Sequence, residues 1–200
     1  MTRLALTGGI ATGKSVVARQ LRAAGVRVVD ADQLARDAVR PGTAGLEAVV
    51  ARFGARVLTA DGRLDRPALG RVVFADAAAR LELERLLHPL VRRGIEDFYG
   101  ELPPGVTGVA EVPLLYETGW VTAFDVAVVT ACRRSTQRDR LVERDRLSEH
   151  DAERRLAAQW PIEDKARIAD AVVVTEGPLA HTAAQAARLA DWIRGRSRPS

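Results

Sequence analysis

The sequence predicts a three-layer α/β fold with a mainly parallel five-stranded sheet. Short apolar runs of strand length alternate with longer segments whose apolar residues recur every three or four positions, as in helices. The first run, Leu4–Thr7, leads through a glycine-rich segment directly into a helical pattern that continues to about Ala24. Strands that alternate with helices form a parallel sheet with helices on both faces.

Four further strands are expected from β-branched and apolar runs, namely Val26–Val29, Val106–Val112, Asp125–Thr130 and Ala171–Thr175. Two helical blocks interrupt the alternation, one at about 36–104 and one, rich in arginine, at about 134–165. We therefore expect a single domain over 1–200, with a core formed by 1–35, 105–133 and 166–200, a helical insertion and a helical lid. Ligands of open α/β sheets bind beyond the carboxyl ends of the strands, and both blocks should overhang that edge.

Within the insertion, the apolar spacing predicts four helices, at Leu46–Phe53, Arg66–Phe74, Ala77–Leu87 and Pro89–Tyr99. Proline is favoured in the first turn of a helix and disrupts a helix interior. The dipeptide His88-Pro89 is therefore interpreted as the start of the fourth helix.

Composition excludes several classes of protein. Hydrophobic residues make up 47% of the 200 residues, which is typical of a globular chain. The lone Cys132, a first strand close to residue 1 and the lack of a membrane-length apolar run favour a cytoplasmic protein without a membrane partner. The net charge of +4 is spread along the chain and aromatic residues make up only 4%, so nucleic acid is not the expected partner. We expect a monomer or a small homo-oligomer.

The segment between the first strand and the first helix is a phosphate-binding loop of the form Gly-x-x-x-x-Gly-Lys-Ser. Gly8 and Gly13 are expected to adopt positive φ, so that the backbone N–H groups and the helix N-terminus face a phosphate. Lys14 supplies a compact positive charge to the β- and γ-phosphates, and the Ser15 hydroxyl is a ligand for Mg²⁺. These features predict a P-loop NTPase fold that binds ATP with Mg²⁺ through Gly8, Gly9, Ile10, Ala11, Thr12, Gly13, Lys14, Ser15 and Val16.

Two counts sharpen this prediction. The chain has no asparagine, which excludes the Asn-Lys-x-Asp guanine motif and argues against a GTPase. Only Lys14 and Lys165 among the 30 basic residues are lysine. Lys165 is therefore either a second functional ammonium or a chance survivor of a strong arginine bias, and the sequence leaves both interpretations open.

Asp30 and Asp32 follow the second strand and should lie at the carboxyl edge beside the loop. Transfer of a phosphoryl group to a hydroxyl needs a carboxylate that orients the acceptor and takes its proton. With a helix beginning near residue 31, Asp32 falls in the first turn and is favoured as the catalytic carboxylate. Asp30 is interpreted as a helix cap or as a ligand of metal-bound water.

Charged residues elsewhere have alternative interpretations. Arg140 and Arg144 lie four residues apart on one face of a lid helix, where they can clamp a transferring phosphoryl group, whereas most other lid charges form a solvated surface. Glu111 and Glu117 are candidates for a metal-bound water or a ribose, and Glu111 is equally well a strand-end carboxylate beside an arginine. His88 is either a cap or core residue or a contact to the substrate.

Further short motifs follow the loop in order: Val29-Asp30-Ala31-Asp32, Leu64-Asp65-Arg66 with Leu69, Val73-Phe74, His88-Pro89-Leu90, Val112-Pro113-Leu114-Leu115-Tyr116-Glu117, Gln137 to Asp145, Arg155, Gln159 and Ala169-Asp170. Their order and spacing resemble the dephospho-CoA kinase family over nearly the whole chain. The resemblance implies transfer of a phosphoryl group from ATP to the 3′-hydroxyl of dephospho-CoA, giving CoA and ADP. The alternative is another small-molecule P-loop kinase, with a nucleotide or a sugar acid as acceptor.

The resemblance also implies roles for particular residues. It supports Asp32, Lys14 and Arg140 as the catalytic set, Arg144 as a nucleotide contact and Ser15 as the metal ligand. Contacts to the acceptor are implied for Asp32, Arg66, His88, Leu114, Leu115 and Glu117. Ala11 and Thr175 depart from the family pattern, which usually has glycine and often asparagine there. Alanine is acceptable at residue 11 if its φ is negative, so we expect little loss.

Overall fold

The computed structural model describes residues 2–196 and divides into two compact units. The first, called the sheet unit, consists of Met1–Asp30 and Glu101–Ser200, and the second, called the helical unit, is Ala31–Gly100. Each unit has its own apolar core. In the described part of the chain, no helix is long and apolar enough to span a bilayer.

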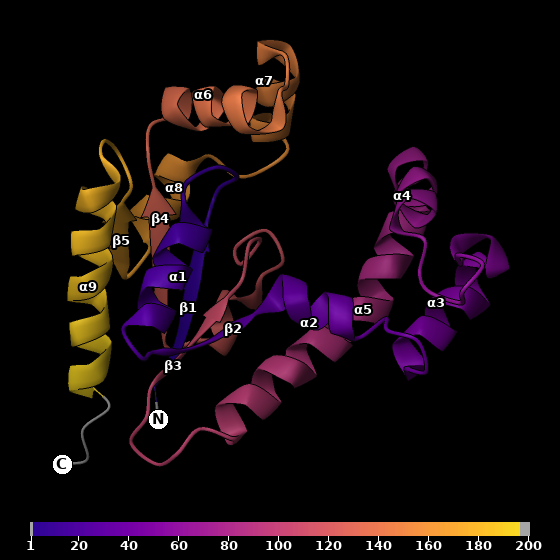
Figure 1. Cartoon of the computed structure of the whole chain (residues 1–200), viewed down its shortest axis with the longest axis horizontal. Helices are drawn as coiled ribbons and strands as arrows, with labels where there is room; N and C mark the ends of the chain where they lie inside the picture. The colour runs from indigo at the N-terminus through magenta and orange to yellow at the C-terminus, as the bar shows by residue number, and fades with distance from the viewer. Residues whose placement is uncertain (1, 197–200) are drawn as a thin grey trace. The chain divides into compact units, whose positions relative to one another are not determined.

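The sheet unit is built on five parallel strands, as predicted, in the order β2-β3-β1-β4-β5 (Figure 1). Their bounds are β1 Arg3–Gly8, β2 Arg27–Asp30, β3 Gly108–Glu111, β4 Val126–Ala131 and β5 Ala171–Val174. Glu111 pairs in register with both Leu6 and Asp30. The last residues of β1, β2 and β3 therefore reach the same carboxyl edge of the sheet.

Helices α1 (Lys14–Ala23) and α9 (Leu179–Arg196) pack together on one face of the sheet, where Leu21 and Ile193 join Leu4 and Leu6 in the core. The alternate strand residues, such as Ala5, are also fully buried, so both faces are covered. Helix α8 (Ile162–Ile168) packs against β4, and the short 3₁₀ helix η2 spans Trp120–Ala123. The sequence pattern did not predict α8 as a separate helix.

The lid segment forms a helical pair, α6 (Arg134–Asp145) and α7 (Glu149–Ala157), which follows the end of β4 (Figure 1). Leu141, Ala152 and Leu156 form a small apolar cluster between the two helices. The Ser148 hydroxyl caps α7 by accepting a hydrogen bond from the Asp151 N–H.

The helical unit consists of α2 (Ala31–Asp37), α3 (Ala44–Phe53), the 3₁₀ helix η1 (Ala55–Val57), α4 (Arg66–Ala75) and α5 (Ala77–Gly100). Thr43 caps α3 and Asp65 caps α4 through their side-chain oxygens. Helices α2, α3 and α4 all pack on α5, and Val39, Val49, Phe53, Val57, Leu69 and Ala79 form the core of the unit.

The division of α5 at Pro89 was predicted wrongly, because one helix of 24 residues runs through this proline. Pro89 removes one backbone hydrogen bond from the helix interior. Apolar residues on both sides of it, Ala79 before and Val91 and Ile95 after, are buried. Packing on both sides of Pro89 therefore maintains the helix, and His88 lies inside α5 and not at the start of a helix.

Candidate active site

The phosphate-binding loop joins β1 to α1 with the geometry of an anion site. Gly13 has a φ of 82° and occupies the N-cap of α1, where no side chain caps the helix. Positive φ at Gly13 is therefore confirmed. The helix begins with uncapped N–H groups and the positive end of its dipole, which together favour a bound phosphate.

Gly8 is required for a different reason from the one predicted. Its φ is not among the positive values, so the prediction for this glycine was wrong. A Cβ atom at residue 8 would instead collide with the hydroxyls of Thr130 and Thr12. The loop needs glycine here because the chain passes too close to these buried side chains for any other residue.

Ala11 contradicts the expectation of a negative φ. Its φ is 60°, in the left-handed region that disfavours residues with a Cβ. Two contacts hold it there. Ile10 and Ala11 pack against the Leu141 and Leu156 cluster of the lid, and the Ala11 carbonyl accepts a hydrogen bond from Arg140 Nη1 at 3.2 Å.

Ala11→Gly is expected to raise the free energy of unfolding by about 0.5–1 kcal/mol. Relief of the left-handed alanine contributes about 1–2 kcal/mol, and the greater freedom of unfolded glycine offsets part of it. Urea unfolding measures the difference. Ala158→Gly is the matched control, because Ala158 has a φ of −77° and should lose stability on the same exchange. A less stable Ala11→Gly protein would contradict the strain argument.

Buried threonines form a hydrogen-bond network with the backbone of the loop. The Thr12 hydroxyl donates to the Gly9 carbonyl at 2.8 Å and lies 2.8 Å from the Thr130 hydroxyl. The Thr175 hydroxyl donates to the Thr12 carbonyl at 2.6 Å. Sequence reasoning missed this network, because threonine in a strand or loop has no motif of its own. Through this network, Thr175 is hydrogen-bonded directly to the loop backbone.

Three lid side chains bond directly to the loop backbone. Gln137 Nε2 donates to the Ile10 carbonyl at 2.6 Å, and the Ile10 N–H donates to Gln159 Oε1 at 2.8 Å. Arg140 Nη2 donates to the Thr175 carbonyl at 2.6 Å, in addition to its bond to Ala11. The two glutamines thus hold both sides of one residue of the loop. The lid and the loop are consequently coupled in position.

Arg140 and Arg144 have different partners, although they share one face of α6. Arg144 forms two hydrogen bonds to Asp145, at 2.7 and 3.0 Å, and Asp145 also pairs with Arg155 at 3.2 Å. Hydrogen bonding to Asp145 raises the pKa of Arg144, and the same contact lowers the pKa of Asp145. Arg140 alone of the pair contacts the loop.

Lys14 points to the strand edge and forms a 2.7 Å ion pair with Glu111. Glu111 is buried at the end of β3, and Arg22 Nη2 lies 3.6 Å from its other oxygen. This placement agrees with the interpretation of Glu111 as a strand-end carboxylate beside basic residues. The pair holds the ammonium of Lys14 at the carboxyl end of β3.

Glu117 is engaged by one buried side chain and by one exposed residue. Its Oε1 lies 2.5 Å from Nζ of the fully buried Lys165 and accepts from the Trp160 N–H at 3.2 Å. Breaking a buried pair of this kind leaves an uncompensated charge. The contact with Glu117 therefore gives Lys165 a structural part in joining α8 to the segment after β3.

The two leucines of the segment after β3 differ in exposure. Leu115 is fully buried and its side chain packs in the core, and its contact with substrate stays a prediction. Leu114 is 41% exposed and stays available for a ligand.

The remaining predicted residues lie at the end of β2 and in the helices of the helical unit. Asp30 is the last residue of β2, and Asp32 lies in the first turn of α2, which begins at Ala31 as expected. Arg66 is the first residue of α4, and His88 is half-buried in α5.

Glu176, after β5, holds the start of the lid. Its carboxylate accepts from the Thr136 hydroxyl at 2.6 Å and from the Arg133 N–H at 2.9 Å, and pairs with the Arg133 guanidinium at 3.1 Å. The bond from Thr136, followed by those from Arg133, lowers the pKa of Glu176 from 4.5 to about 2. The carboxylate is therefore ionised wherever the protein is folded above that pH.

Because the folded pKa lies below the unfolded one, Glu176 stabilises the fold above about pH 4.5, and that contribution is lost as the pH falls toward about 2. Glu176→Gln should therefore flatten the dependence of stability on pH in this window. Urea unfolding at several pH values measures the slope. Glu143→Gln, at an exposed position of α6, controls for the loss of one charge. A slope unaffected by Glu176→Gln would contradict the assignment.

Comparison with known proteins decides the family. The family model described as dephospho-CoA kinase matches residues 2–181, which include the loop, all five strands, the helical unit and the lid. The chain belongs to the dephospho-CoA kinase family. Dephospho-CoA kinase from Anaeromyxobacter dehalogenans is 48% identical over 197 residues, covering 98% of this chain and 93% of the relative. The enzyme of that name from Symbiobacterium thermophilum is 44% identical and covers 92% and 78%.

Solved structures agree with this membership of the dephospho-CoA kinase family. TT1252 from Thermus thermophilus is 33% identical with a TM-score of 0.79, covering 95% of this chain and 97% of that one. Dephospho-CoA kinase from Campylobacter jejuni is 26% identical with a TM-score of 0.74, covering 96% and 97%. Shikimate kinase from Acinetobacter baumannii, at 14% identity and a TM-score of 0.53, shares the fold. The predicted P-loop kinase fold is confirmed.

Proposed function

We propose that this protein transfers the γ-phosphoryl group of ATP to the 3′-hydroxyl of the ribose of dephospho-CoA, giving CoA and ADP, the final step of coenzyme A biosynthesis. The observation that carries the proposal is the family match over residues 2–181, which includes an intact Gly8–Ser15 loop. The acceptor, a nucleotide-like molecule, supplies a hydroxyl and two phosphates of its own.

The donor half of the reaction is assigned to the loop. Uncapped N–H groups at the start of α1 receive the phosphates, and Lys14 neutralises charge that develops on the transferred group. The phosphates compete with Glu111 for the Lys14 ammonium, which pairs with Glu111 at 2.7 Å. Glu111 thus stabilises Lys14 before ATP arrives.

The phosphate-binding loop offers few protein ligands for a metal ion, and this suits Mg²⁺. The residues that the structure describes contain no cluster of three metal-binding side chains, and Mg²⁺ is commonly held by one or two protein oxygens together with substrate phosphates and water. The Ser15 hydroxyl, in the first turn of α1, is the proposed protein ligand. When bound, the ion neutralises charge on the β- and γ-phosphates.

Asp32 is the proposed acceptor carboxylate. It follows the end of β2 by two residues, in the first turn of α2, and β2 ends in register with Glu111. Its role is to accept a hydrogen bond from the ribose hydroxyl and to take the proton as the bond to phosphorus forms.

The lid completes the site through Arg140. A guanidinium has five N–H donors, and bonds to the Ala11 and Thr175 carbonyls leave others to contact phosphate. Arg144 is proposed as a second nucleotide contact, which requires that its bond to Asp145 be exchanged for one to phosphate. Besides Asp32, the residues proposed to contact the acceptor are Leu114, Leu115, Glu117, His88 and Arg66.

One assay separates the candidate acceptors. ADP release is measured with ATP, Mg²⁺ and one acceptor at a time, namely dephospho-CoA, nucleosides, nucleotides, gluconate and shikimate. We expect kcat/KM for dephospho-CoA to exceed that of every other compound. Turnover of a nucleotide or a sugar acid without turnover of dephospho-CoA would show that the protein is a different small-molecule kinase.

A further inference from the structure

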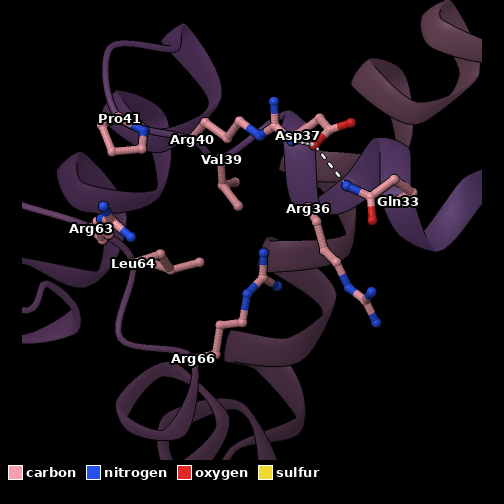
Figure 2. Close-up of a pocket in the computed structure, with 9 residues that line it drawn as sticks. All are labelled: Gln33, Arg36, Asp37, Val39, Arg40, Pro41, Arg63, Leu64 and Arg66. Carbon is pink, nitrogen blue, oxygen red and sulfur yellow. Dashed lines mark hydrogen bonds and ion pairs between the residues drawn. The ribbon is translucent and has the colours of Figure 1, made fainter.

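The helical unit contains a pocket of about 440 Å³ that lies within this unit alone. Figure 2 shows its walls, which are α2, the turn after it with Val39 and Pro41, the Arg63-Leu64 segment and the first residue of α4. Val39 is buried and Leu64 packs on the same core, so the floor is apolar and fixed. Leu64 also pairs with Leu58 in an antiparallel bridge, which holds the Arg63-Leu64 segment in place.

Four arginines and one aspartate line this pocket, so its charge is strongly positive. The arginines are Arg36, Arg40, Arg63 and Arg66. Arg40 pairs with Asp37 at 2.7 Å, and Arg63 pairs with Asp61 at 3.0 Å. Within residues 2–196, neither the Arg36 nor the Arg66 guanidinium has an ion pair or hydrogen bond to a protein group. Two guanidinium groups therefore lack an anionic partner in a pocket that is already basic.

The position of these two arginines is set by local structure. Arg66 is the first residue of α4, whose N-terminus is fixed by the Asp65 cap, and Figure 2 shows its side chain reaching toward α2. Arg36 lies on α2, four residues after Asp32, so the two share one helix face about 6 Å apart along the axis. A carboxylate and a guanidinium are thus presented one turn apart on the same helix.

We propose that this pocket binds the diphosphate of the acceptor, with Arg36 and Arg66 as its main ligands. The inference rests on the proposed function and names the part of dephospho-CoA that the helical unit recognises. In that acceptor, a single ribose separates the 3′-hydroxyl from the 5′-diphosphate, and on α2 a single turn separates Asp32 from Arg36. Planar guanidinium groups bind phosphate oxygens through paired hydrogen bonds, which gives both charge and orientation.

The test uses the full-length protein saturated with Mg²⁺ and a non-hydrolysable ATP analogue, so that the Gly8–Ser15 loop is already filled. Calorimetry then measures the affinity for three probes: dephospho-CoA, inorganic pyrophosphate and adenosine, which lacks phosphate. The variants are Arg36→Gln and Arg66→Gln, which keep much of the side-chain stem. Arg80→Gln is the control, because Arg80 is exposed on α5, lies in the same unit and pairs with Glu84 at 3.8 Å. Circular dichroism verifies that each variant is folded.

We expect each pocket variant to weaken binding of dephospho-CoA and pyrophosphate at least about tenfold, the loss of one charge-assisted contact. Adenosine affinity and the Arg80→Gln protein should be unchanged. Unchanged binding of both phosphate-bearing probes, or an equal loss for adenosine, would overturn the proposal. Turnover of dephospho-CoA by the wild-type protein is measured in parallel. Its absence, with arginine-dependent pyrophosphate binding intact, would overturn the proposed function and leave the anion pocket standing.

Discussion

Asp32→Asn is expected to lower kcat with dephospho-CoA by about 10²–10⁴-fold, the range for removal of a general base. The amide keeps the size of the side chain and its place in the first turn of α2, but it cannot accept the proton of the ribose hydroxyl. The affinity for ATP should stay within twofold of wild type, because ATP binding is assigned to the loop. Steady-state kinetics and calorimetry with the ATP analogue measure the two quantities.

Asp30→Asn is the matched comparison for this prediction. Asp30 has the same chemistry, lies two residues earlier at the end of β2, and is interpreted as a cap or as a ligand of metal-bound water. We expect a smaller fall in kcat than for Asp32→Asn. A larger fall for Asp30→Asn, or near wild-type turnover of Asp32→Asn, would show that the base has been assigned to the wrong residue.

Lys14→Met is expected to reduce both turnover and stability. Turnover should fall by at least about 10²–10³-fold, because one preorganised positive group is lost from the transferring phosphoryl group. The free energy of unfolding should fall by about 3–5 kcal/mol, because the Glu111 carboxylate stays buried after its main partner is removed. Urea unfolding and ADP release measure the two effects.

The double variant Lys14→Met/Glu111→Gln separates these two effects. Neutralising Glu111 removes the uncompensated charge, so most of the lost stability should return. Turnover should remain as low as in the single variant, since the positive charge at the phosphates is still missing. If turnover recovers together with stability, Lys14 acts on the fold and not on the phosphoryl group.

Much of the sheet could be predicted because its signals are local. Each strand is a short apolar run, and the strand ends at Gly8, Asp30 and Glu111 lie within one or two residues of the predicted ends. The glycine-rich loop was equally predictable, because the spacing of its glycines and lysine and the flanking strand and helix are contained in one short segment. Family membership followed from the order of several such motifs along the chain.

Features that depend on contacts distant in sequence could not be predicted. The φ of Ala11 is set by Arg140 and by the lid cluster, more than a hundred residues later. The need for glycine at residue 8 comes from Thr130 on a neighbouring strand. Helix α5 continues through Pro89 because of tertiary packing, which local propensity does not contain.

Charged residues were the hardest to assign from sequence. Glu117 and Lys165 are 48 positions apart in the chain, and only the fold shows that they form a buried pair. The sequence did not predict a binding role for Arg36, because an isolated arginine on a short helix belongs to no motif. The arrangement of Arg36 with Arg66 in one pocket is visible only after α2 and α4 are placed on α5.

The most direct test of the proposed function is the position of the transferred phosphate. The protein is incubated with Mg²⁺, dephospho-CoA and ATP that carries an isotopic label in its γ-phosphoryl group, and the product is examined by mass spectrometry and phosphorus NMR. We predict one labelled phosphate monoester on the 3′-oxygen of the adenosine ribose, formed in equal amount with ADP. Label on another oxygen of the acceptor, or ADP formed without labelled CoA, would contradict the account.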